Sequence, residues 1–241
     1  DIWPDVKRSD LTGIEAVLHT PQGPLAMTSP LVGRHNLENI LAATGCGIAL
    51  DLPLDPIQSG IAATTAVPGR LESVPDPAGR FIYVDYAHTP DALENVLQAL
   101  DALRQGRIIC VFGCGGDRDR RKRPLMGEIA ARMSDLAVVT SDNPRTEDPL
   151  SIIEDALEGV RRAAPRSYTM DTVQKGFGER GHMVLPDRRE AIGLAIGVAE
   201  PGDTVLIAGK GHETYQIIGR TSIPFDYLEE HFIKGNTFRS F

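Results

Sequence analysis

Residues 107–119 read RIICVFGCGGDRD, an apolar run that passes directly into a glycine-rich, charged loop. The apolar part has the length of a buried strand. Three other segments repeat the arrangement: FIYVD before YAHTPD at 81–91, LAVVTS before DNPR at 136–145, and TVLIA before GKGHE at 204–213. Each predicted strand therefore ends in a polar loop that glycine or proline marks.

Helical patterns alternate with these strands. Thr89 is a predicted N-cap with Pro90 at the first helical position, and an Asp-Pro pair repeats this signal at 148–149. Two more helices are predicted, one beginning at Pro124 and one over residues 187–199. The alternation predicts an α/β fold with a doubly wound, mostly parallel sheet. In such a sheet the four polar loops share one edge, which is where ligands bind.

The first part of the chain follows a different pattern. Residues 14–28 predict a hairpin, a helix starts near Asn36, and a shorter helix runs from Asp55 to Thr64. The run VPGR at 67–70 then breaks the pattern, and we expect a domain boundary there. The two expected domains are residues 1–69 and 70–241.

Composition and charge restrict the class of protein. The chain has 241 residues, 41% hydrophobic and 24% charged, as in an ordinary globular protein of one large domain or two small ones. A formal net charge of −8 argues against general nucleic-acid binding. Three cysteines without a C-x-x-C pair suit a reducing compartment and suggest no metal site. Neither a signal peptide nor an apolar stretch of membrane-spanning length occurs, so we expect a cytoplasmic location.

The glycine-rich loop invites comparison with phosphate-binding motifs. It fails the dinucleotide pattern G-x-G-x-x-G because Arg118 stands at the sixth position, and no G-x-x-x-x-G-K-[ST] sequence is present. The glycines can expose backbone amides to an anion, or they can simply make a tight turn. The basic run at 117–123 is correspondingly either a solvated face or part of an anion site.

Two other loops carry side chains suited to an amino acid. Asp142 and Asn143 can form a turn, Pro144 fixes the next bend, and Arg145 can then offer its planar fork to a carboxylate. Glu213 can accept hydrogen bonds from an ammonium group. The alternatives are a capped turn with a surface arginine, and a surface carboxylate.

Histidines and catalytic groups give weaker signals. His88 and His212 are either ligand contacts or structural histidines, and the sequence assigns no role to His19, His182 or His231. No residue stands out as a catalytic group.

Four ordered motifs together resemble the Mur ligases of peptidoglycan synthesis, and in particular their diaminopimelate-adding class. They are YAHTPDALENVL at 86–97, FGCGGDRDRRKRPLMGEIA at 112–130, TSDNPRTEDP at 140–149 and AGKGHETYQ at 208–216. The resemblance covers nearly the whole chain, including SPLVGRHNLENILAA and PGRLE. It implies that residues 1–69 are the end of an α/β ATPase domain and that residues 70–241 are the C-terminal, amino-acid-binding domain.

The resemblance also implies an activity. The family forms an amide with ATP and Mg²⁺: ATP phosphorylates a substrate carboxylate, and the incoming amine attacks the acyl phosphate. The expected substrates are UDP-N-acetylmuramoyl-L-alanyl-D-glutamate and meso-diaminopimelate. The UDP-sugar domain, the P-loop, the magnesium ligands and the carbamylated lysine of the family are expected outside this chain, so we expect the chain alone to be inactive.

Site residues follow from the same resemblance. Those expected to hold diaminopimelate are Arg118, Asp142, Asn143, Pro144, Arg145, Gly209 and Glu213. Those expected to contact ATP are Asn36, Arg70, Asp85 and His88. Physical logic agrees, because diaminopimelate differs from lysine by a distal carboxylate, which Arg118 and Arg145 can bind.

Two alternative functions stay open. The chain could belong to a related amide ligase, of the lysine-adding or folylpolyglutamate type, although the DNPR motif argues against both. It could instead be an amino-acid-binding module without catalytic activity.

Overall fold

The computed structural model describes residues 1–225, and the chain divides into two compact units between Ser73 and Val74. This division lies close to the boundary expected between residues 69 and 70. No helix in the described part of the chain is long and apolar enough to cross a membrane.

The first unit is a small antiparallel sheet with two helices. Its elements are β1 (Trp3–Asp10), β2 (Gly13–Thr20), β3 (Gly23–Ser29), α1 (Arg34–Ala49) and α2 (Leu54–Ala63). The predicted hairpin is the β2–β3 pair, and β1 extends the sheet on the other side of β2. Alternate residues of β2 and β3 are buried, and they pack with Ile40 of α1 and Ile61 of α2. A period of two on the strands therefore supplies one apolar face for the helices to cover.

The second unit is built on a six-stranded sheet in the order β4-β5-β9-β6-β7-β8, whose edge strand β4 begins two residues before the division, at Glu72. The strands are β4 (Glu72–Val74), β5 (Phe81–Asp85), β9 (Thr204–Ala208), β6 (Ile108–Phe112), β7 (Leu136–Val139) and β8 (Gly181–Val184). Every pair from β5 to β8 is parallel. The central strands are buried along their full length, as expected of a parallel sheet covered on both faces.

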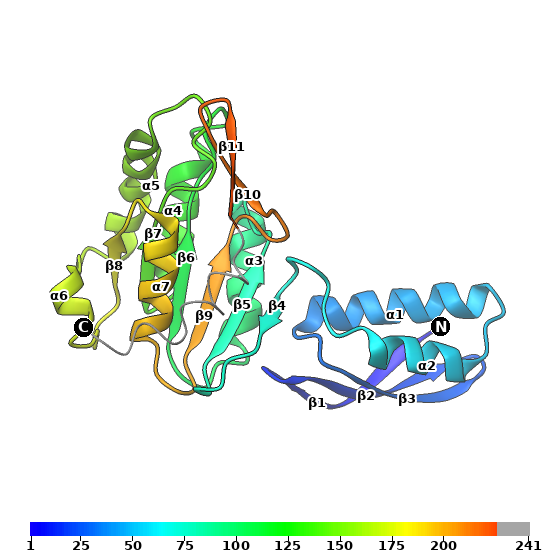
Figure 1. The fold of residues 1–241 in the computed structure, drawn as a ribbon. Coiled ribbons are helices and arrows are strands. Elements are labelled where there is room, and N and C mark those ends of the chain that lie inside the picture. The colour runs from blue at the N-terminus through cyan, green and yellow to red at the C-terminus, as the bar shows by residue number, and fades with distance from the viewer. Residues whose placement is uncertain (226–241) are drawn as a thin grey trace. The chain divides into compact units, whose positions relative to one another are not determined.

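Helices cover the two faces of this sheet. They are α3 (Pro90–Asp101), α4 (Lys122–Met133), α5 (Pro149–Ala163), α6 (Met170–Val173) and α7 (Arg188–Val198). Figure 1 shows α7 in front of the sheet and α3 and α4 behind it, so the predicted doubly wound α/β fold is confirmed. The predicted caps are also confirmed: Thr89 accepts from the Ala92 amide and Asp148 from the Ser151 amide. Pro90 stands at the first helical position of α3.

Several elements were not expected from the sequence. They are β1, β4, β8, α6 and the hairpin of β10 (Tyr215–Ile218) and β11 (Thr221–Pro224). Two of the three histidines to which the sequence assigned no role contact other residues of the protein. His19 stacks on Trp3 at 3.6 Å between ring centroids, and His182 Nδ1 lies 2.8 Å from the Ala164 carbonyl oxygen. His231 lies outside the described residues.

Candidate functional site

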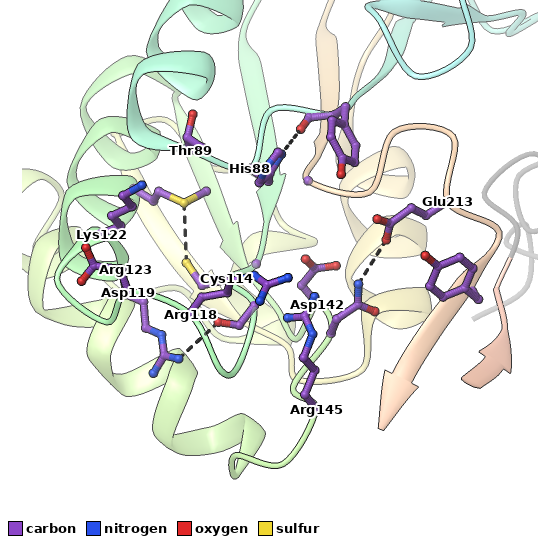
Figure 2. A pocket seen from close by; sticks show the side chains of 17 residues that line it. His88, Thr89, Cys114, Arg118, Asp119, Lys122, Arg123, Asp142, Arg145 and Glu213 are labelled. Carbon is purple, nitrogen blue, oxygen red and sulfur yellow. Dashed lines mark hydrogen bonds between the residues drawn. The ribbon is translucent and has the colours of Figure 1, made fainter. Parts of the chain in front are cut away.

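Loops from the carboxyl ends of β5, β6, β7 and β9 surround a cavity of about 390 Å³ (Figure 2). The topology therefore brings together the four polar loops, as the sequence predicted. The lining includes Arg118, Asp142, Asn143, Arg145, Gly209 and Glu213. Among the residues expected to hold the amino acid, Pro144 is the exception, because it is buried beside the cavity and is not part of its lining.

Glycines let the loop after β6 cross the DNPR loop at close range. The Gly116 amide donates to the Asn143 carbonyl oxygen at 2.9 Å. A Cβ on Gly116 would lie 1.8 Å from the Pro144 carbonyl oxygen, which is far inside contact distance. A Cβ on Gly113 would likewise meet the Thr140 carbonyl oxygen at 2.6 Å. These glycines are therefore required for backbone approach, and they fix the two loops against each other.

The side chains of the basic run at 117–123 are not all solvent-exposed. Arg123 is buried, and its guanidinium donates to both oxygens of Glu147, at 2.7 and 2.9 Å, and to Asp155 at 2.8 Å. Its Nη2 also donates to the Gly115 carbonyl oxygen at 3.2 Å. Arg123 therefore joins the glycine-rich loop to the middle of α5 and to Glu147, just after the DNPR motif.

The bonds from Arg123 in this clamp stabilise the charged form of Glu147. The hydrogen bonds from Arg123, followed by the one from the Asp117 backbone amide, lower the pKa of Glu147 to about 2. Elsewhere in the run, Arg120 pairs with Asp155 and Arg121 with Asp119. Two arginines of the run line the cavity, Arg118 and the buried Arg123.

Arg145 is held in a backbone conformation that non-glycine residues rarely adopt. Its φ is 51°, in the left-handed region. The Arg145 amide donates to the Ile217 carbonyl oxygen at 3.2 Å, and its carbonyl oxygen accepts from the Gly219 amide at 2.7 Å. The guanidinium Nη1 donates to the Gly116 carbonyl oxygen at 2.7 Å. The β10–β11 hairpin and the glycine-rich loop therefore orient this side chain, and strain of this kind is common at binding sites.

The other expected residues form a buried polar network. Lys210 is fully buried and donates to Asn143 Oδ1 at 2.5 Å, while Asn143 Nδ2 donates to Glu213 Oε2 at 3.1 Å. Burial lowers the pKa of Lys210, and the nearby Asp142 carboxylate opposes that shift. Asn143 thus uses its side chain to connect two loops, in place of the local turn that the sequence suggested.

The residues expected to contact ATP lie in both units. In the first unit, Asn36 is buried and donates to the Val32 carbonyl oxygen at 2.8 Å, whereas Arg70 is exposed. In the second unit, Asp85 is buried at the end of β5 and accepts from the Ala87 amide at 2.8 Å. His88 is exposed and lines the cavity.

Sequence reasoning missed part of the lining. Tyr86 was not expected in the lining, and its ring lies 4.5 Å between centroids from that of His88, which was expected to contact a ligand. Lys122 and Thr89 lie across the cavity from Glu213 in Figure 2. Thr89 was predicted only as a helix cap. Its position in the loop after a parallel strand, β5, was the signal that it could also line the cavity.

The chemistry of the lining suits a group that carries both charges. Arg118 and Arg145 offer planar donors to a carboxylate, while Glu213 offers acceptors to an ammonium group. Within residues 1–225, no group of three histidine, cysteine, aspartate or glutamate side chains lies close enough together to hold a metal ion.

Known proteins resemble this chain in sequence. A family model described as the glutamate ligase domain of Mur ligases matches residues 69–211. A UDP-N-acetylmuramoyl-L-alanyl-D-glutamate–2,6-diaminopimelate ligase of Geobacter metallireducens is 55% identical over 218 residues. The protein of the same name from Trichormus variabilis is 51% identical over 232 residues. These matches cover 90% and 95% of this chain but 43% of each relative, so the chain spans less than half of their length.

Solved structures show the same relation. The structure of a ligase with the same name as these relatives is 39% identical, with a TM-score of 0.66, and the match covers 95% of this chain and 44% of that one. A folylpolyglutamate synthase from Thermotoga maritima is 22% identical, with a TM-score of 0.63 over 87% of this chain and 44% of its own. At that identity, the second match shows a shared fold alone.

Proposed function

Because this chain belongs to the Mur ligase family, we propose that it is the amino-acid-binding part of a ligase that joins meso-diaminopimelate to UDP-N-acetylmuramoyl-L-alanyl-D-glutamate. The observation that carries the proposal is the pairing of Arg118 and Arg145 with Glu213 around one cavity. This set complements an amino-acid head group. Relatives at 49–55% identity carry the name of the diaminopimelate-adding ligase, which supports the choice of amino acid.

In this proposal the two parts of the chain have different tasks. Residues 70–241 form the amino-acid-binding domain, and residues 1–69 form the end of the ATPase domain. The remainder of that domain and the domain that binds the UDP-sugar belong to sequence outside this chain. The complete protein would act in the cytoplasm on small-molecule substrates.

The residues of the cavity hold the amino acid for reaction. Arg118 and Arg145 bind its distal carboxylate, with Asn143 as a further donor. Glu213 and the Gly209 carbonyl oxygen receive the ammonium group at the same end. The other amine is then held close to the activated carboxylate, which converts a bimolecular encounter into a positioned one. The cavity contributes binding and orientation.

ATP, with Mg²⁺, supplies the phosphoryl group that activates the carboxylate of the acceptor substrate. Asn36, Arg70, Asp85 and His88 are the residues of this chain proposed to contact the nucleotide. The main nucleotide and magnesium ligands are proposed to lie outside it, because the chain contains no G-x-x-x-x-G-K-[ST] sequence.

A phosphate-release assay on the complete protein tests the proposal. With ATP and the UDP-linked dipeptide present, meso-diaminopimelate should start phosphate release, whereas lysine and glutamate should leave it near background. Residues 1–241 alone should give background with every amino acid. Preference for lysine or glutamate would refute the proposed substrate in favour of a related ligase, and a complete protein that binds diaminopimelate without turnover would indicate a binding module.

A further inference from the structure

Behind the cavity wall lies a buried cation, Lys210, that is not part of the lining. Its side chain is 0% exposed. Besides the bond to Asn143 Oδ1, Nζ donates to the Tyr215 carbonyl oxygen at 2.8 Å. It also lies 3.3 Å from Asp142 Oδ1 and 3.7 Å from Glu213 Oε2. Lys210 therefore contacts four residues of the cavity wall from inside the protein: Asp142, Asn143, Glu213 and Tyr215.

These contacts determine which way the Asn143 amide faces. Lys210 Nζ and the Ile217 backbone N–H are both donors only, and they converge on one Asn143 atom at 2.5 and 2.9 Å. That atom must be the amide oxygen. The nitrogen then faces Glu213, to which it donates at 3.1 Å. One of the two N–H groups of Asn143 is thus used by Glu213, and the other is the donor that Asn143 can offer to a ligand, while its acceptor oxygen is taken by Lys210 and Ile217.

Glu213 is the hydrogen-bond acceptor beside Asn143. The contacts with Asn143 and Lys210 both fall on Oε2, so Oε1 is the oxygen that an ammonium group in the cavity can reach. The positive charge of Lys210 lies near two carboxylates, those of Asp142 and Glu213. The cavity wall thus presents a donor at Asn143 beside an acceptor at Glu213, and the contacts with Lys210 fix which position donates and which accepts.

We propose that Lys210 is a positioning residue that gives the amino-acid site its polarity, with the donor at Asn143 and the acceptor at Glu213. This inference rests on the proposed function and deepens it. An amino-acid head carries its carboxylate and its ammonium group on the same carbon. If the order of donor and acceptor were reversed, the carboxylate would meet an acceptor and the ammonium group a donor. The order at the wall therefore selects one orientation of the head group.

Calorimetric titration of the complete protein tests this role with Lys210→Met. Diaminopimelate has two positive and two negative groups, so the long-range effect of losing one buried charge nearly cancels for this ligand. Misplaced donors and acceptors should nevertheless lower its affinity by about ten- to hundredfold, the range for lost hydrogen bonds to charged groups. The dication 1,5-diaminopentane, which lacks carboxylates, should bind the variant no more weakly than the wild type. Lys175→Met, at an exposed lysine after α6, is the matched control and should leave both affinities unchanged.

Wild-type affinity of Lys210→Met for diaminopimelate would overturn the inference alone. Failure of the wild-type protein to bind diaminopimelate would overturn the proposed function and the inference with it. The two failures are therefore distinguishable in one series of titrations.

A double substitution separates polarity from charge balance, and it decides the matter if Lys210→Met does not fold. Asn143→Asp with Glu213→Gln keeps the number of carboxylates around Lys210 and allows a hydrogen bond between positions 143 and 213. It exchanges which position donates and which accepts. We expect a melting temperature near that of the wild type together with a loss of diaminopimelate affinity of about tenfold or more. Wild-type affinity in this variant would show that charge balance alone matters, and would overturn the inference.

Discussion

Replacing Arg145 with alanine should separate recognition of the amino acid from recognition of the nucleotide. The described contacts of the guanidinium place Nη1 on the Gly116 carbonyl oxygen at 2.7 Å, and the side chain lines the cavity. The remaining N–H groups can form a two-point contact with a ligand carboxylate. In Arg145→Ala the carboxylate would lose this contact, while the ATP contacts proposed at other residues would remain.

The magnitude follows from the exposure of the side chain. Arg145 is half-buried, so the loss should lie toward the lower end of the roughly 2–5 kcal/mol seen when one partner of a buried charge pair is removed. A loss of about 3 kcal/mol corresponds to more than a hundredfold in affinity. The bond from the charged guanidinium to the Gly116 carbonyl oxygen is half-exposed, so its loss should lower stability by about 1.5 kcal/mol, the low end of the range for charged groups. We therefore expect a steep rise in KM for diaminopimelate, an almost unchanged KM for ATP and a small drop in melting temperature.

Steady-state kinetics on the complete protein, with the melting temperature of each variant, provide the assay. Arg145→Lys should recover only part of the affinity, because an ammonium group cannot reproduce a planar two-point contact. Arg161→Ala is the matched control, since this arginine is exposed and pairs with Glu154, and neither residue lines the cavity. Equal rises in KM for both substrates, together with a clearly lower melting temperature, would show that Arg145 merely braces its loop, and would refute the reasoning.

Three further predictions concern the clamp between the loops. Arg123→Met should lower the free energy of unfolding by about 1–3 kcal/mol in urea denaturation, because Glu147 and Asp155, which are partly exposed and keep other donors, lose the guanidinium that they share; a change below about 0.5 kcal/mol would contradict this. The pKa of Glu147 is lowered to about 2 in the folded protein, so its stabilising contribution should be complete above the ordinary value near 4.5 and should be lost as the pH falls toward 2. Glu147→Gln should flatten that part of the stability profile, and an unchanged slope would argue against the clamp. Gly116→Ala should lower both stability and diaminopimelate affinity through its clash with Pro144, whereas Gly178→Ala, with open space around it, should change neither.

Much of the second unit could be predicted from local sequence. The four central strands are continuous apolar runs, and Thr89 with Pro90 marks the start of α3 by a purely local hydrogen bond. The convergence of the loops then followed from the parallel topology, because the carboxyl ends of the strands share an edge. Strand β8 was missed because GHMV is short and its pairing with β7 depends on residues far away in the chain.

The detailed arrangement of the site could not be predicted from the sequence in the same way. Lys210 can be buried because Asn143 and the Tyr215 carbonyl oxygen accept its hydrogen bonds. Both partners lie outside the GKGHE motif, so the motif alone did not predict the burial. The burial of Arg123 likewise depends on carboxylates from α5 and from the DNPR loop, so within the basic run it looked like its exposed neighbours. Charged side chains are rarely buried without a partner, and the tertiary fold decides which partners come within reach.

A crystal structure of the complete protein with meso-diaminopimelate bound tests the central claim most directly. We predict one carboxylate of the ligand between Arg118 and Arg145, with the ammonium group of the same end within hydrogen-bond distance of Glu213. Diaminopimelate bound elsewhere in the protein, or bound in this cavity with a carboxylate against Glu213, would contradict the account.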